Sequence, residues 1–144
     1  MFKLAINIYL WSIFLAFSQG VYAEGFDYFA HINKYTKCEA LQNVIANISS
    51  ESEQDFYQHE SHHDSLDSRI IALEFAGAGN YKESLVNKLY ASYLDEYRVL
   101  LKESDDVDMF AASLKSPAKK CRQLNEMQED VIRRKREQNK KANR

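Results

Sequence analysis

Glycine and proline are scarce in this chain, which has four glycines and one proline in 144 residues. These residues end helices and form the tight turns between β-strands, and a β-rich domain of this length needs many more of them. Residues that favour helices, such as leucine, alanine, glutamate, lysine and glutamine, are abundant. The composition therefore predicts an all-α fold built from long helices.

Long hydrophobic runs are lacking beyond the N-terminus, where residues 4–17 form the one extended apolar run. Lys3 precedes this run, and Val21-Tyr22-Ala23 follows it with the small-residue pattern that signal peptidase cleaves. We predict that residues 1–23 are a cleaved signal peptide and that the mature chain is periplasmic or secreted. The alternative is an uncleaved N-terminal anchor, although the run is shorter than the ~20 residues that span a bilayer. After cleavage we expect no transmembrane segment.

Cysteine is limited to two residues, Cys38 and Cys121. In an oxidising compartment an even pair of cysteines favours one disulfide, and the alternative is two unpaired buried thiols. The two cysteines are 83 positions apart, and in chain-entropy models a disulfide that closes a loop of this length stabilises the folded state by roughly 4 kcal/mol.

Apolar residues recur at three- and four-residue steps in four segments, which predicts four helices. The expected helices cover about 26–48, about 50–76 and about 81–103, and the last one begins at Val107 and continues past Pro117. The glycines at positions 77 and 79 suit a left-handed helix end between the second and third helices.

The four segments predict an up-down-up-down four-helix bundle over residues 24–132, with a basic tail over residues 133–144. In this topology the first and last helices are neighbours, so that a bond between the two cysteines would join them. We expect the last helix to be long and kinked near Pro117. The alternative is a short helix followed by a new helix that begins at Ser116.

One histidine cluster suggests a metal site. His59 and His63 lie four residues apart and share a helix face, as do the paired imidazoles of many metal sites. His31 or Asp64 would complete the ligand set. The alternative is a solvated bundle end, in which the histidines titrate beside carboxylates. We expect no other cofactor.

Two further groups are candidates for contact with a partner protein. Tyr90, Tyr93 and Tyr97 follow one helix face, which suits either a binding surface or the edge of the bundle core. The basic tail contains Arg133, Arg134 and Arg136, and it could also make weak contact with an anionic membrane surface. An exported chain is not expected to bind nucleic acid.

Motifs of common enzyme and cofactor classes are lacking: there is no CxxC, CxxCH or GxSxG pattern and no phosphate-binding glycine loop. No convergent acid–base set can be named. The sequence therefore predicts an exported, non-enzymatic binding or accessory protein that acts on an envelope or secreted partner. The alternative is a metal-binding periplasmic protein that uses His59 and His63.

Overall fold

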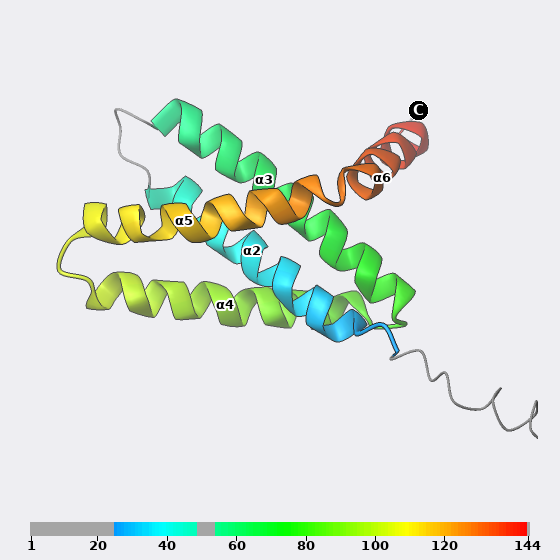
Figure 1. The fold of residues 1–144 in the computed structure, drawn as a ribbon, viewed down its shortest axis with the longest axis horizontal. Helices are drawn as coiled ribbons and strands as arrows, with labels where there is room; N and C mark the ends of the chain where they lie inside the picture. Colours follow the sequence, from blue (N-terminus) through cyan, green and yellow to red (C-terminus); the bar gives the residue numbers. More distant parts are fainter. Residues whose placement is uncertain (1–24, 49–53, 144) are drawn as a thin grey trace, which may run out of the picture.

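The computed structural model describes residues 25–48 and 54–143, and within these ranges it is entirely helical (Figure 1). This confirms the all-α prediction for the described part of the chain. The predicted signal peptide, residues 1–23, lies outside it. None of the described helices is long and apolar enough to cross a membrane. The helices are α2 (Tyr28–Ile48), α3 (Gln54–Ala78), α4 (Glu83–Glu103), α5 (Val107–Glu126) and α6 (Glu129–Ala142).

Helix α2 occupies the centre of the molecule and contacts α3, α4 and α5. In Figure 1, α2 and α3 run obliquely to α4 and α5. Because α2 is covered from several sides, it buries polar as well as apolar residues. The Tyr35 hydroxyl donates to the carbonyl oxygen of Leu124, and the Gln42 amide donates to that of Ala118, each over 3.2 Å. These bonds satisfy the Tyr35 hydroxyl and the Gln42 amide nitrogen, whereas Oε1 of Gln42 is buried without a hydrogen-bond partner in the described part of the chain.

The core consists of two clusters of buried residues. The first, here called the disulfide cluster, joins α2, α4 and α5. The second, the α3 cluster, joins α2 and α3 with the beginnings of α4 and α6. The disulfide cluster contains Cys38, Ala40, Leu41, Val44, Tyr97, Phe110, Leu114 and Cys121. The α3 cluster contains Ile32, Tyr35, Ile71, Ala72, Ala76, Val86 and Ile132.

A disulfide joins α2 to α5, as the cysteine pattern predicts. The sulfur atoms of Cys38 and Cys121 are 2.03 Å apart, and the residues are separated by 83 positions in the chain. Both cysteines are buried in the disulfide cluster. The bond therefore fixes the central helix to a helix near the other end of the sequence.

Helix α5 continues through Pro117, so no new helix begins at Ser116. The interruption lies instead at Met127 and Gln128, between α5 and α6. Figure 1 shows α6 turned away from the direction of α5. This turn lets Ile132 enter the α3 cluster, where the side chain is 7% exposed. Most of the predicted basic tail therefore belongs to α6, and Lys135 and Arg136 of this tail contact α3.

The turn between α3 and α4 differs from the prediction in which residue adopts a left-handed conformation. Asn80 has φ 60°, whereas none of the described glycines has positive φ. Asparagine tolerates this conformation better than most residues. Gly79 is needed for a different reason, because a Cβ atom there would lie 2.6 Å from the Cβ atom of Tyr28. The glycine thus permits close approach of the turn to the start of α2.

Candidate functional site

The predicted metal ligands do not gather at one point. His59, His63 and Asp64 line one groove, whereas the His31 ring stacks on the Phe75 ring with centroids 4.8 Å apart. Phe75 lies twelve residues after His63 on α3, a separation of about 18 Å along a helix. Within the described residues, no three His, Cys, Asp or Glu side chains form a group that could hold a metal ion.

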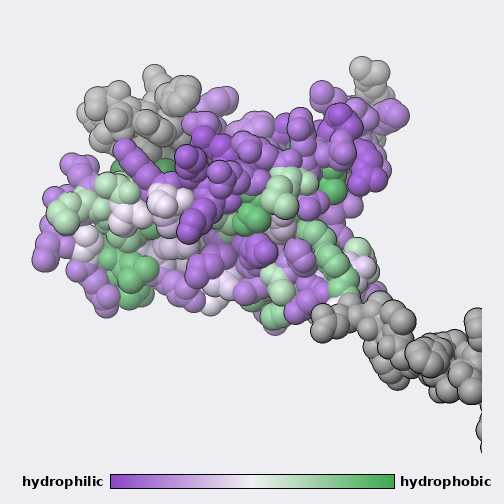
Figure 2. Space-filling model, viewed as in Figure 1, coloured by the Kyte–Doolittle hydropathy of each residue, from purple (hydrophilic) through white to green (hydrophobic). Residues whose placement is uncertain are grey.

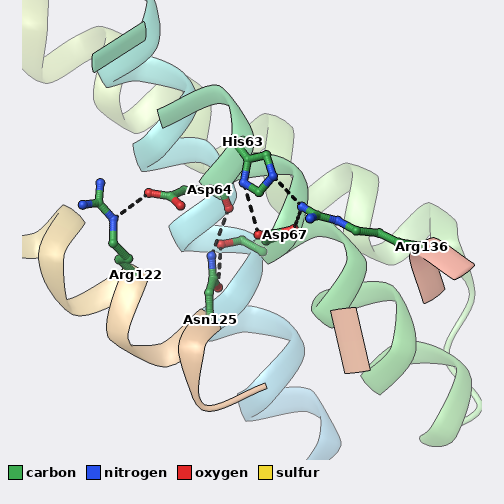
Figure 3. A network of polar contacts seen from close by, with 7 residues as sticks. His63, Asp64, Asp67, Arg122, Asn125 and Arg136 are labelled. Atoms are coloured by element: carbon green, nitrogen blue, oxygen red, sulfur yellow. Dashed lines mark hydrogen bonds and ion pairs between the residues drawn. The ribbon is translucent and has the colours of Figure 1, made fainter. Parts of the chain in front are cut away.

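The His63 ring is surrounded by protein groups on both nitrogen atoms (Figure 3). Nδ1 lies 3.4 Å from Oδ2 of Asp67, and Nε2 lies 2.8 Å from a guanidinium nitrogen of Arg136. The same guanidinium also pairs with Asp67. A positive charge beside the ring opposes the approach of a metal cation. His63 and Asp67 therefore serve here to hold α6 on α3.

An open groove of about 910 Å³ lies where α3, α5 and α6 meet, and we call it the α3–α6 groove. Figure 2 shows that the surface over these helices is strongly hydrophilic. Its walls carry charges of both signs. The lining residues are His59, Glu60, His63, Asp64, Asp67, Arg122, Asn125, Glu126, Glu129, Ile132, Arg133, Arg136, Glu137 and Lys140.

Arg122 connects α5 to two acidic residues of α3. Its Nη1 atom lies 2.8 Å from Oε1 of Glu60, and its Nε atom lies 3.0 Å from Oδ2 of Asp64. Partial burial acts to lower the pKa of Arg122, but the hydrogen bond and charge of Asp64, with the charge of Glu60, outweigh this effect and raise it. The Arg122 guanidinium is therefore held in its charged form by residues of the groove itself.

Asn125 makes a second connection between α5 and α3. Its amide nitrogen donates to the backbone oxygen of Asp64 over 3.0 Å, and its amide oxygen accepts from the Ser68 hydroxyl over 3.0 Å (Figure 3). Asn125 and Ser68 are 4% and 0% exposed. Each of these two buried side chains therefore provides a hydrogen-bond partner for the other in a region that water does not reach.

Asp67 is the most buried carboxylate that contacts α6. Burial raises the pKa of Asp67, whereas the charges of Arg136 and His63 lower it and the charge of Asp64 raises it further. Burial of a carboxylate is costly unless a cation accompanies it. The Arg136 guanidinium therefore balances the negative charge of Asp67, which is largely buried.

The three candidate tyrosines face α2. The Tyr97 side chain is 9% exposed, the Tyr93 hydroxyl donates to Oδ1 of Asn33, and the Asn43 amide donates to the Tyr90 hydroxyl. Burial raises the pKa of both Tyr90 and Tyr97. These residues form the edge of the core.

The three candidate arginines divide between two roles. Arg136 points into the α3–α6 groove, as described above. Arg133 pairs with Asp130 on its own helix over 2.6 Å, and the Arg134 Nε atom donates to the Asp130 carbonyl oxygen over 3.3 Å. Arg133 and Arg134 remain exposed on α6.

A buried ion pair between α2 and α3 was not anticipated from the sequence. Glu39 is 7% exposed, and its Oε1 atom lies 3.5 Å from Nη1 of Arg69. Its other oxygen has no hydrogen-bond partner within the described residues. Burial raises the pKa of Glu39 to about 7, although the charge and hydrogen bond of Arg69 act in the opposite direction. Only the packing of α3 and α4 around α2 buries this side chain, so the local pattern gave no signal.

Several apolar side chains are exposed where α4 and α5 are joined, and we call this surface the α4–α5 end. It comprises Val99, Leu100, Val107 and Met109, which are 51%, 50%, 50% and 71% exposed. Figure 2 shows hydrophobic surface near the joined ends of these helices. Val99 lies two residues after the buried Tyr97, a spacing that places it on the opposite helix face.

A cavity of about 480 Å³ lies between α2 and α4, and none of the four residues of the α4–α5 end lines it. Leu94, Tyr97 and Leu101 of α4 form one wall, and Val44 and Ile48 of α2 form the other. Asn43, Asn47, Tyr90 and Arg98 complete the lining, so the cavity has both apolar and polar walls.

Comparison with known proteins found no matching family model, no matching curated protein and no matching solved structure.

Proposed function

We propose that this chain is an exported, non-enzymatic accessory protein that binds an envelope or secreted protein through the α4–α5 end. The observation that carries the proposal is the exposure of four apolar side chains around one short turn. Single exposed apolar residues are ordinary, but a group of them at one place marks an interaction surface.

The α4–α5 end is held in a defined position, which favours binding. Oδ1 of Asp106 accepts hydrogen bonds from the backbone nitrogens of Asp108 and Met109 over 2.8 and 3.2 Å and so caps α5. Phe110 and Leu114, just beyond the cap, are buried in the disulfide cluster. A surface that is already ordered loses less conformational entropy when a partner binds.

The cavity between α2 and α4 suits an apolar side chain of the partner. Leu101 lines this cavity, and the exposed Leu100 lies about 100° around the helix axis from it, outside the cavity lining. Binding surfaces commonly combine such a pocket with surrounding apolar contacts, and an amphipathic helix offers the matching pattern. We therefore expect the partner to present the apolar face of a helix.

The disulfide and the N-terminal signal-like pattern support export, since disulfides persist in oxidising compartments. The ion pairs of the α3–α6 groove support a structural role for its charged residues, because Arg122 and Arg136 are each engaged by acidic residues of α3. Perturbed groups in ion-pair networks are not by themselves catalytic.

Photo-crosslinking in the source cells tests the proposal. A photoreactive amino acid is placed at Met109 of the full exported chain, and a matched variant carries it at the exposed Lys88 of α4. We expect position 109 to yield a discrete crosslinked protein that position 88 does not. Leu100→Lys in the same chain should abolish that product. The proposal fails if both positions give the same products, if neither gives one, or if the product survives Leu100→Lys.

A further inference from the structure

The face of α3 that packs against α6 carries a row of four side chains: one histidine, two carboxylates and one isoleucine. His63, Asp67, Ile71 and Glu74 follow one another at steps of four, four and three residues, so that they lie on one side of the helix. We call these four residues the acceptor stripe. It runs along the middle of α3, away from the α4–α5 end.

Helix α6 contacts the stripe between His63 and Ile71 through one apolar and one charged side chain. Ile132 shares the α3 cluster with Ile71. Arg136, four residues later, pairs with Asp67 and lies 2.8 Å from Nε2 of His63. Ile132 and Arg136 are four residues apart on α6, so both side chains lie on the helix face that packs against α3.

At the Glu74 end of the stripe, one exposed ion pair joins α3 to α6. Nζ of Lys135 lies 2.9 Å from Oε1 of Glu74, and the two side chains are 40% and 43% exposed. Arg136 is similarly accessible, with 41% of its side chain exposed. Exposed ion pairs contribute little stability each and are screened by salt. Helix α6 is thus fastened by the buried Ile132 and by ion pairs whose cationic ends, Lys135 and Arg136, are accessible to a competitor.

We propose that α6 is a displaceable occupant of the acceptor stripe and that the stripe binds a basic helical segment of a partner protein. The segment would carry an apolar residue followed three and four positions later by Lys and Arg, as Ile132, Lys135 and Arg136 are spaced here. In the isolated chain α6 occupies this site and blocks it.

Charge complementarity supports this choice of partner. Between residues 54 and 78 the chain has five acidic residues and one basic residue, whereas residues 129–142 have six basic and three acidic residues. Asp67 is 8% exposed while α6 is in place, and its carboxylate is paired with Arg136, so displacement of α6 removes the cation that accompanies this charge. An incoming basic helix replaces that cation, and an acidic or neutral helix does not. The acceptor stripe shares no residue with the α4–α5 end, so this inference does not rest on the proposed function.

Displacement of α6 is measured first, in the full-length mature chain. Arg136→Glu should increase hydrogen exchange of the α6 amides, and so should raising the salt concentration on the wild type. The matched control is Arg133→Glu, which makes the same charge change on the same helix but removes only a pair with Asp130. Unchanged exchange in α2 shows that the fold is intact. Arg136→Gln serves as a milder variant if Arg136→Glu disturbs the fold.

Binding to the vacated stripe is then measured by fluorescence anisotropy, with a labelled peptide of residues 128–142 as the probe. Occupancy of the site by α6 lowers the apparent affinity of the wild type, so we expect about tenfold tighter binding to the Arg136→Glu chain. Adding Asp67→Asn to that chain should abolish the gain. Equal affinity for the wild type and Arg136→Glu, no effect of Asp67→Asn, or unaltered α6 exchange in both Arg136 variants would each overturn the proposal.

Discussion

The disulfide cluster and the α3–α6 groove hold the same chain together by different means. The cluster joins α2, α4 and α5 through buried apolar side chains and one covalent bond. The groove joins α3 to α5 and α6 through ion pairs and an amide. Apolar burial responds weakly to salt and pH, whereas exposed ion pairs respond strongly. We therefore expect the disulfide cluster to be the persistent region when salt or pH changes, and the α3–α6 groove to be the responsive region.

Removal of the disulfide should have the largest effect, and it tests the persistent region. Cys38→Ser with Cys121→Ser should lower the free energy of unfolding by about 4 kcal/mol, because the unfolded chain is no longer closed into a long loop. Urea unfolding followed by circular dichroism measures the change. Reduction of the wild type should give the same loss. A stability unaffected by reduction would show that apolar packing alone holds this region.

A pH series tests the buried Glu39 of α2, which pairs with Arg69 of α3. Its folded pKa of about 7 exceeds the ordinary value of 4.5, so the folded state binds the proton more tightly than the unfolded state does. Stability should therefore be full below pH 4.5 and fall as the pH rises to 7. The loss above pH 7 approaches about 3 kcal/mol.

Glu39→Gln should remove most of this loss, since the amide stays neutral. The raised pKa of Asp67 leaves a smaller decline of the same sign. Urea unfolding of both proteins between pH 4 and pH 8 is the measurement. Parallel pH profiles for the two proteins would contradict the assignment to Glu39.

The smallest effect is expected at Asn125, which tests the responsive region. Asn125→Ala leaves the buried Ser68 hydroxyl and the Asp64 carbonyl without their partner, at a cost of about 1–2 kcal/mol. Gln123→Ala, on an exposed position of the same helix, is the matched control and should change stability little. Thermal unfolding measures both variants. Equal effects would mean that the amide bridge adds nothing to the packing of α5 on α3.

The helices and the cysteine pair were predictable because their signals are local or compositional. Breaks at residues 104–106 and near Gly79 appear in the structure about where the pattern places them. The effect of Pro117 was not predictable in this way, because a helix can continue past proline when packing on both sides supports it, as Phe110 and Cys121 do here. The break at Met127 serves the burial of Ile132, a contact between distant segments.

In the candidate site too, local features were predictable from the sequence, whereas contacts between distant segments were not. The spacing of His59 and His63 correctly placed them on one helix, but which side chains face them depends on how α5 and α6 pack on α3. Arg122 and Arg136 are the residues that meet the acidic face, and neither has a local signature that distinguishes it from the other basic residues nearby. The tyrosine face was visible in the sequence, whereas its contact with α2 was not.

The helical content, the main helix boundaries and the separation of acidic and basic segments follow from the amino-acid sequence alone, because they depend on residues that are near one another in the chain. Tertiary structure alone decided that α2 is central, that Glu39 and Asp67 are buried, and that α6 lies on α3. The physical reason is that burial and charge pairing are properties of surfaces brought together from distant segments, and no local pattern specifies which surfaces will meet.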